Sequence, residues 1–229
     1  MSDHNLTGRQ SVAGLWARNG FRFQDQWILY NLVGWLSDSL FRGFVNEGAD
    51  DVDVFWYNTP SKSGFYSERY QLKDRNLDNR TLDEILTGFD QAQQRNMGSW
   101  TRFHVVSTRC ALGTEGLPAT LTRMRDMRVA YLESSVEYRA AAAAFKEQLK
   151  KLKINASPEF LVNYVQLDFA AAWILNADSY WKGFHGPLMS IGVDEEKVAD
   201  AAAALLHMIT TTHVGKLVDV NADCQRWST

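Results

Sequence analysis

The stretch ERYQLKDRN, residues Glu68–Asn76, decides which fold we expect, because its polar and apolar residues alternate as they do along a β-strand. In an extended chain Gln71 and Lys73 lie on one face, whereas Tyr70 and Leu72 lie on the other. The sequence therefore predicts a strand that places an amide and an ammonium group side by side on a polar face.

A second strand of this kind is predicted upstream, at DVDVFWY, residues 51–57. Asp51 and Asp53 share its polar face. If the two strands pair antiparallel, these carboxylates converge with Gln71 and Lys73. Carboxylate oxygens are preferred ligands of Mg²⁺, and a lysine beside the ion can orient or deprotonate an attacking water molecule. The same alternation is typical of a sheet with one solvated face, so both interpretations stay open at this point.

The remaining pattern indicates an α/β protein with a helical second half. An amphipathic helix is expected from Gly20 to about Gly43, and a second helix from a capping box at Thr81 and Glu84. A short buried strand is expected at residues 103–108, and helix-forming composition dominates from Gly116 onward. The segment 160–175 suits a strand that runs into a buried helix, although periodicity does not decide between them.

One domain is expected over residues 1–229, because no linker of glycine and serine interrupts the chain. Its parts are a loose N-terminal arm (1–14), an α/β core (15–115) and a helical part (116–229). A hydrophobic fraction of 45% is typical of a folded core.

Charge and composition limit the classes of function. The formal net charge of −3 gives no global attraction to nucleic acid, so a polyanion needs a local basic patch. Candidates are Arg75 and Arg80, or a later group formed by Arg123, Arg125 and Arg128, for which a solvated helix face is the favoured interpretation. The two distant cysteines and the lack of a signal sequence or a long apolar segment predict a cytoplasmic protein without membrane contact.

Three motifs in order, GFRFQ (20–24), NEGADDVDV (46–54) and YQLK (70–73), resemble the PD-(D/E)XK, or restriction-endonuclease-like, nucleases. The arrangement is most similar to the N-terminal nuclease domain of CBASS- and Lamassu-type anti-phage effectors. The resemblance implies a restriction-endonuclease-like fold, in which helices flank a central mixed sheet.

The resemblance also assigns roles to individual residues. It implies that Asp51 binds the metal, that Gln71 is a second ligand and that Lys73 is the catalytic lysine. Glu47 or Asp50 could supply the carboxylate that a glutamine ligand lacks. Accessory positions are Gln24, Asp50 and Asp53, and the substrate-binding candidates are Arg75 and Arg80.

The function expected from this resemblance is a Mg²⁺- or Mn²⁺-dependent endonuclease that cuts double-stranded DNA with little sequence specificity in antiviral defence. Because the chain is acidic, we expect activation by clustering as a homo-oligomer or by a regulatory partner. The alternatives are a catalytically silent scaffold that kept the nuclease fold and a metal-dependent phosphodiesterase that acts on RNA.

Overall fold

The computed structural model describes residues 23–46, 51–59, 61, 64–95, 98–110, 113–175, 185–211 and 217–219. The chain divides into two compact units. The first comprises Met1–Phe65, Leu72–Asp74 and Ala172–Thr229, and the second comprises Tyr66–Gln71 and Arg75–Ala171. The prediction of one domain stays a prediction.

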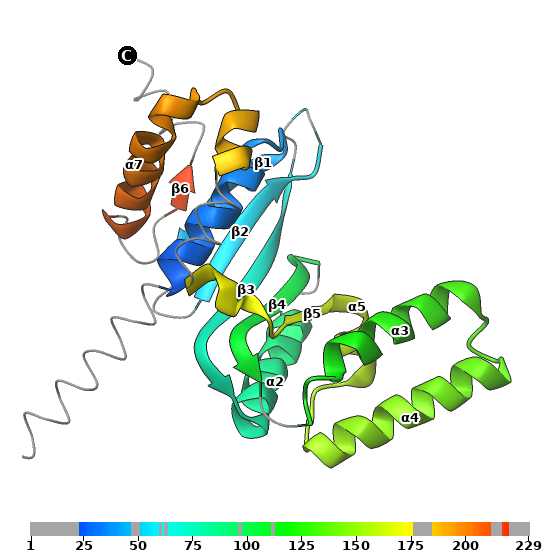
Figure 1. Cartoon of the computed structure of the whole chain (residues 1–229). Coiled ribbons are helices and arrows are strands. Elements are labelled where there is room, and N and C mark those ends of the chain that lie inside the picture. The colour runs from blue at the N-terminus through cyan, green and yellow to red at the C-terminus, as the bar shows by residue number, and fades with distance from the viewer. Residues whose placement is uncertain are drawn as a thin grey trace, which may run out of the picture. The chain divides into compact units, whose positions relative to one another are not determined.

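Six strands form a sheet in the order β5-β4-β3-β2-β1-β6 (Figure 1). Their bounds are β1 Phe41–Asn46, β2 Asp51–Tyr57, β3 Phe65–Leu77, β4 Trp100–Cys110, β5 Val165–Asp168 and β6 Leu217–Asp219. Strand β3 contributes residues to both units. Because β1 pairs antiparallel with β2 whereas β4 pairs parallel with β5, the sheet is mixed. The predicted α/β class with a mixed sheet is confirmed.

In the first unit the chain turns earlier than the sequence predicted. The first helix covers residues 23–36 rather than extending to about Gly43, and residues 41–46 form β1, a strand that the pattern did not predict. The helix stops because Asp38 closes a turn, in which its carboxylate accepts a hydrogen bond of 2.8 Å from the backbone N–H of Leu40. Phe41 then enters the sheet and pairs with Trp56.

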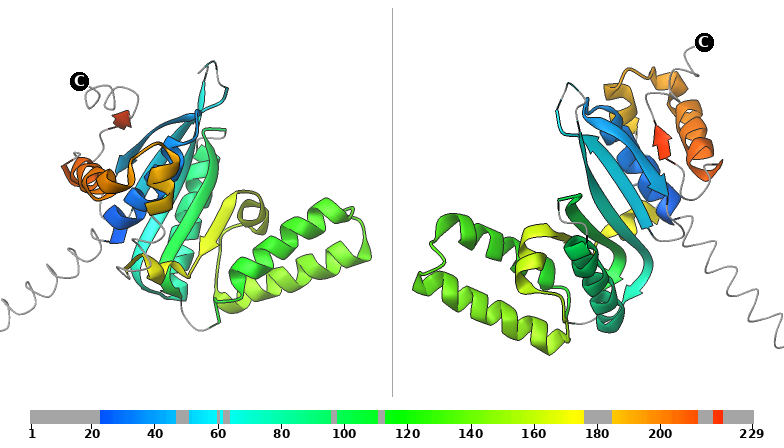
Figure 2. Two further views of the ribbon diagram at one scale, coloured as in Figure 1. Left: turned by 45° about the horizontal axis from the view of Figure 1, so that its top comes forward. Right: turned by 180° about the vertical axis from the view of Figure 1, so that it is seen from behind.

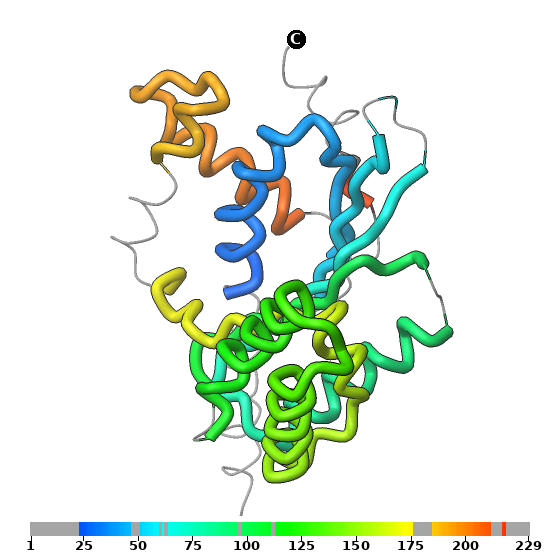
Figure 3. The backbone as a smooth tube through the Cα atoms, turned by 90° about the vertical axis from the view of Figure 1, so that its right-hand side faces the viewer, coloured from blue at the N-terminus to red at the C-terminus, as the bar shows by residue number. Residues whose placement is uncertain are grey.

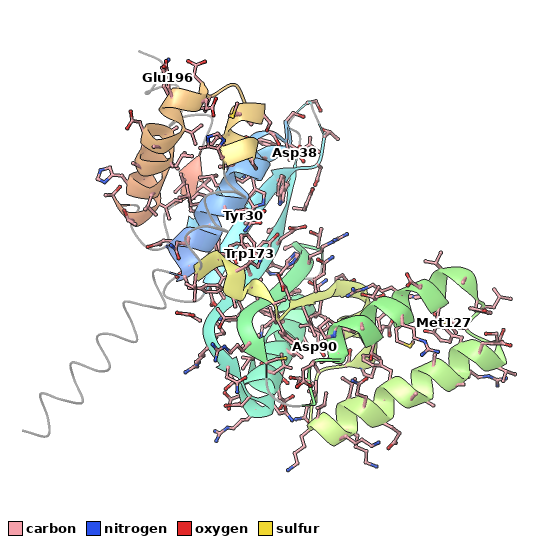
Figure 4. The ribbon with its side chains drawn as sticks, in the orientation of Figure 1. Tyr30, Asp38, Asp90, Met127, Trp173 and Glu196 are labelled. Carbon is pink, nitrogen blue, oxygen red and sulfur yellow. The ribbon has the colours of Figure 1, made fainter. Side chains whose placement is uncertain are left out.

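Aromatic packing joins the first helix to its surroundings in this unit. The Trp35 ring lies 5.7 Å from Phe41 and 6.5 Å from Phe44 of β1, measured between ring centroids. On the same helix, Tyr30 meets the ring of Trp173 edge-on at 4.6 Å (Figure 4). Trp173 belongs to the short 3-10 helix η1, Ala171–Leu175. Trp35 is buried by its contacts, whereas Tyr30 is half-buried.

Gly43 permits strand β6 to pair with strand β1. Strand β6 pairs antiparallel with β1, with Phe44 opposite Val218. A Cβ atom on Gly43 would lie 2.1 Å from the carbonyl oxygen of Val218, which is shorter than any real contact. Only glycine therefore lets the two backbones approach here. The 3-10 helix η2 (Glu195–Lys197) and α7 (Val198–Thr211) precede β6 in the chain.

The second unit is built around one hydrophobic cluster. Phe103 of β4 is fully buried, and its ring centroid lies 4.8 Å from Phe89, 5.5 Å from Phe160 and 5.8 Å from Trp100. The helices of this unit are α2 (Asn79–Arg95), α3 (Leu117–Ala130), α4 (Val136–Leu152) and α5 (Pro158–Tyr164). Three of them, α2, α4 and α5, bury phenylalanine side chains in this cluster.

The N-terminus of α2 lies earlier than predicted. The carboxylate of Asp78 accepts a hydrogen bond of 2.7 Å from the backbone N–H of Thr81, as an N-cap residue does. The predicted capping box at Thr81 and Glu84 is therefore wrong. Thr81 is the third residue of α2, and the side chain of Glu84 instead accepts a hydrogen bond from Arg80.

Helices α3 and α4 lie side by side as an antiparallel hairpin (Figure 2), and the tube view shows the same pairing (Figure 3). The connection from α4 to α5 is fastened to α2 by two carboxylates. Asp83 accepts a hydrogen bond of 2.6 Å from the backbone N–H of Asn155, and Asp90 accepts one of 2.8 Å from that of Ser157. The side chain of Ser157 then caps α5. This fastening fixes where α5 and β5 begin.

Candidate functional site

Three predicted site residues lie in the first unit. Asp51 and Asp53 are on β2, and Lys73 is on β3. Asp53 and Lys73 are buried, with 3% and 8% of their surface exposed, and Asp51 is half-buried. The strand positions that the alternation predicted are confirmed, whereas the catalytic and metal-binding roles stay predictions.

Gln24 is fully buried on the first helix, where the resemblance placed an accessory residue. Its amide nitrogen donates a hydrogen bond of 2.7 Å to the side-chain oxygen of Asn46, which ends β1. Its amide oxygen is buried without a hydrogen-bond partner among the residues that the structure describes. Sequence analysis missed Asn46, because β1 was not predicted. Glu47 and Asp50 lie outside the described residues.

Gln71 belongs to the second unit, so the trio predicted to bind metal and activate water is divided between the two units. Within the described parts of the chain, no group of three histidine, cysteine, aspartate or glutamate side chains is placed to hold a metal ion. Two of the expected carboxylates are among the residues not described. The Mg²⁺ or Mn²⁺ site therefore stays a prediction.

The two predicted substrate-binding arginines both have exposed side chains. Arg80 forms an exposed ion pair of 2.9 Å with Glu84, one turn further along α2. The Arg75 side chain is exposed at the end of β3, and its backbone carbonyl accepts a hydrogen bond of 2.9 Å from Ser107.

A pocket of about 280 Å³ lies in the second unit, between β4, α3, α5 and β5. Its lining is basic and partly apolar, because Val129 and Val162 lie beside the polar side chains of Arg102, Arg125, Arg128, Asn163, Tyr164 and Gln166. No acidic residue is among its lining residues. Two of its arginines belong to the group for which the sequence favoured a solvated helix face. The signal that sequence analysis missed was Arg102, which the strand β4 brings beside them.

Arg125 is held firmly at this pocket. Its Nε donates a hydrogen bond of 2.8 Å to the carbonyl of Val162, and its Nη2 donates to the carbonyls of Leu161 and Val165. These carbonyls lie at the C-terminal end of α5, where a helix has unpaired acceptors and a cation is favoured. Burial, and then the positive charge of Arg102, lower the pKa of Arg125. The two guanidinium groups are therefore close enough to repel each other.

A second cluster of ionisable groups lies on β3 and β4. The hydroxyl of Tyr70 donates a hydrogen bond of 2.7 Å to Glu68, and the ring of His104 stacks on that of Tyr70 with 4.0 Å between centroids. His104 Nε2 is 3.6 Å from the same carboxylate. Burial and the charge of Glu68 raise the pKa of Tyr70. Burial also acts to raise the pKa of Glu68, but interactions with His104, Tyr70 and Arg102 outweigh it and lower that pKa.

Comparisons with known proteins identify relatives of one class. The chain is 32% identical over 135 residues to a CD-NTase-associated protein 4 of Moraxella osloensis, and 24% identical over 162 residues to one of an Acinetobacter strain. These alignments cover 58% and 70% of this chain, but only 28% and 34% of the relatives. The chain thus spans about a third of the length of the curated relatives it matches. No protein-family model matches the chain.

Solved structures show the same likeness. The Moraxella osloensis Cap4 SAVED/CARF-domain containing receptor matches 84% of this chain and 43% of its own, with a TM-score of 0.64 and 20% identity. Two structures of the Acinetobacter baumannii Cap4 receptor, one with 2'3'3'-cAAA and one with 3'3'3'-cAAA, match 83% of this chain with TM-scores of 0.63 and 0.65. Both are 18% identical to this chain and are matched over 40% and 42% of their own length. This chain has the fold of the matched part of these receptor chains.

These findings correct the function expected from the sequence. The solved structures are described as Cap4 SAVED/CARF-domain containing receptors and the curated relatives as CD-NTase-associated protein 4, and none of them is described as a PD-(D/E)XK nuclease. The predicted metal-dependent DNA endonuclease is therefore not supported, and neither are the silent scaffold or the RNA phosphodiesterase.

The predicted partner is corrected as well. The ligands named with the solved structures are cyclic trinucleotides, whereas the sequence predicted double-stranded DNA. The expected activation of an endonuclease by clustering or by a regulatory partner is not supported either, whereas the assignment of Arg75 and Arg80 as substrate-binding residues stays a prediction. Among the described helices, none is long and apolar enough to cross a membrane.

Proposed function

We propose that this chain acts in a receptor for cyclic oligonucleotides in bacterial antiviral defence and that it takes part in binding the ligand. The observation that carries the proposal is the likeness to Cap4 receptors, which is 32% identity over 135 residues in one relative and a shared fold over more than four fifths of the chain. The ligand class follows from the cyclic trinucleotides named with two of those structures.

The second unit offers chemistry that suits such a ligand. A cyclic trinucleotide carries three phosphodiester charges, and arginine is well matched to phosphate oxygens because its planar guanidinium donates two parallel hydrogen bonds. The pocket at Arg102, Arg125 and Arg128 supports the proposal on this ground. A cytoplasmic location belongs to the proposal. The finer fold assignment made from the sequence, a restriction-endonuclease-like sheet, stays a prediction on which the proposal does not depend.

The test is direct binding. The chain is titrated with 3'3'3'-cAAA and with 2'3'3'-cAAA in a calorimeter, and its thermal unfolding is measured with and without each ligand. A ligand that binds only the folded state stabilises it by about 2.7 kcal/mol at a concentration about 100 times its dissociation constant. We expect stabilisation by at least one of the two cyclic trinucleotides and a weaker effect of linear triadenylate.

The Acinetobacter baumannii Cap4 receptor serves as the positive control, because its structures are described with both ligands. If that receptor binds while this chain gives neither heat nor a shift in unfolding temperature, the proposal that this chain takes part in ligand binding is wrong.

A further inference from the structure

The arginine-lined pocket of the second unit has the features of an anion site. Its lining carries three guanidinium groups and no carboxylate, on a chain whose net charge is −3. Arginines on an acidic protein are usually balanced by nearby acids, as Arg80 is by Glu84. In this pocket Arg128 stands near Glu133, outside the lining, whereas Arg102 and Arg125 form no ion pair with any described residue. A concave patch with this local excess of positive charge suits an anionic ligand.

The guanidinium groups have donors to spare. Arg102 is exposed on β4 and makes no hydrogen bond or ion pair to any described residue. Arg125 uses Nε and Nη2 on the carbonyls at the end of α5, whereas its Nη1 makes no hydrogen bond within the described part of the chain. Arg128 is tied through Nη1 to Asn163 and stands 3.7 Å from Glu133. One arginine is thus free to close on a ligand, while the other two are held in place for it.

The electrostatics of the pocket favour an added negative charge. Burial and the charge of Arg102 lower the pKa of Arg125, which shows that the two positive charges repel each other when no anion lies beside them. The charge of Arg102 also helps to lower the pKa of Glu68. The Glu68 carboxylate, however, accepts a hydrogen bond of 2.7 Å from the Tyr70 hydroxyl and lies 3.6 Å from His104 Nε2. A phosphate between the two arginines would remove their repulsion, which is the energetic reason for binding one there.

The size of the pocket limits what enters it. A volume of about 280 Å³ is at the lower end of the range for small-molecule sites, which is roughly 300–1,000 Å³. One phosphate and part of its neighbouring nucleoside therefore fit, and a whole cyclic trinucleotide does not. Asn163, Tyr164 and Gln166 border the same pocket and offer an amide, an aromatic ring and a second amide to a sugar or base.

We propose that this pocket binds one phosphodiester of a nucleotide ligand, held by Arg102 and Arg125, with Asn163 and Gln166 beside its sugar or base. The choice of a cyclic trinucleotide as the ligand rests on the proposed function, whereas the choice of phosphate rests on the pocket. The rest of the ligand lies outside the pocket.

Arg102→Gln is the decisive variant. Arg125 donates hydrogen bonds to the carbonyls at the end of α5, so its replacement could unfold the unit. Arg102 is exposed and makes no hydrogen bond within the described part of the chain, so its replacement should leave the fold intact. Loss of its charged hydrogen bonds is expected to weaken the binding of 3'3'3'-cAAA by about 10- to 100-fold. Arg109→Gln is the matched control, because it removes the same charge from an exposed position on the same strand outside this pocket. We expect the control to change affinity by no more than about twofold.

A second probe separates this inference from the proposed function. Pyrophosphate is titrated into the wild type and both variants, and the Nε–Hε signals of Arg102 and Arg125 are followed by NMR. We expect these signals to move in the wild type and in Arg109→Gln, and the Arg125 signal to move less in Arg102→Gln.

Each outcome decides one point. If 3'3'3'-cAAA binds the wild type and Arg102→Gln equally, the pocket assignment is wrong and the proposed function stands. If the chain binds no cyclic trinucleotide but pyrophosphate moves both arginine signals, the phosphate site stands and the proposed function is wrong. If neither probe has an effect, both are overturned.

Discussion

Asp25, on the first helix, carries a carboxyl group that the fold withdraws from water. Burial raises its pKa from 3.8 to about 6. The folded protein therefore binds a proton at pH values where the unfolded chain has lost it, and the free energy of unfolding falls as the pH rises from about 4 to about 6. Above pH 6 both states are ionised, and this contribution no longer changes.

We expect Asp25→Asn to remove this dependence, because the amide does not titrate. At pH 7 the free energy of unfolding of the variant should exceed that of the wild type by on the order of 1 kcal/mol, a value reduced for the partial exposure of the side chain. Near pH 4 the two free energies should match. Urea unfolding at both pH values measures the difference, with Asp126→Asn on the exposed face of α3 as the control. Parallel pH profiles of wild type and Asp25→Asn would contradict the assignment.

At the scale of elements, α4 ends in a conformation that its sequence does not favour. Lys153 has φ 57° and ψ 39°, in the left-handed region, and the backbone N–H of Ile154 closes the helix on the carbonyl of Leu149 at 2.9 Å. Glycine is the usual residue at this position because it has no Cβ to collide with the backbone.

Lys153→Gly is therefore expected to stabilise the protein by about 0.5–1 kcal/mol. Lys153→Val, whose branched side chain resists this conformation, should destabilise it by more than the glycine gains. The order of urea midpoints, glycine above lysine above valine, checks the cap. A valine variant as stable as the wild type would show that the helix ends in another way in solution.

The elements also show how far the sequence could predict the fold. The alternation of polar and apolar residues at DVDVFWY and ERYQLKDRN located β2 and β3, because this pattern is local in sequence. It did not predict that Asp53 and Lys73, on the polar faces, are buried. Strand β1 was missed because FRGFVN continues the apolar composition of the preceding helix, and the turn at Asp38 that separates them depends on a single side chain. The pairing of β1 with β6 depends on distant residues and left no local signal.

The candidate pocket was predictable only in part for the same reason. Arg125 and Arg128 lie three residues apart on α3 and could be grouped from the sequence. Arg102, Asn163 and Gln166 come from other elements, and only folding places them beside that helix. The resemblance in the motif order misled the functional prediction, since the solved structures that share this fold are described as receptors.

For the whole molecule, the division of the chain into two compact units predicts that one unit can lose stability while the other keeps it. Phe103 is part of the hydrophobic cluster of the second unit. We expect Phe103→Ala to lower the free energy of unfolding of that unit by about 3–5 kcal/mol. We expect hydrogen exchange of β4 and α2 amides to accelerate accordingly, while amides in the β1–β6 pairing of the first unit keep their protection. Leu132→Ala, at a position 79% exposed, is the control. Equal acceleration in both units would show that they unfold together.

The pairing of β6 with β1 also has a consequence for synthesis on the ribosome. The second unit is almost continuous in the chain, from Arg75 to Ala171, and can collapse as soon as it emerges. Strand β1 emerges before that unit and β6 after it, so β1 has an unpaired edge throughout the intervening translation. An unpaired edge is a template for strands of other chains. The interval between making these two strands is therefore when the nascent protein is most exposed to aggregation, and slow translation of the middle of the message would lengthen it.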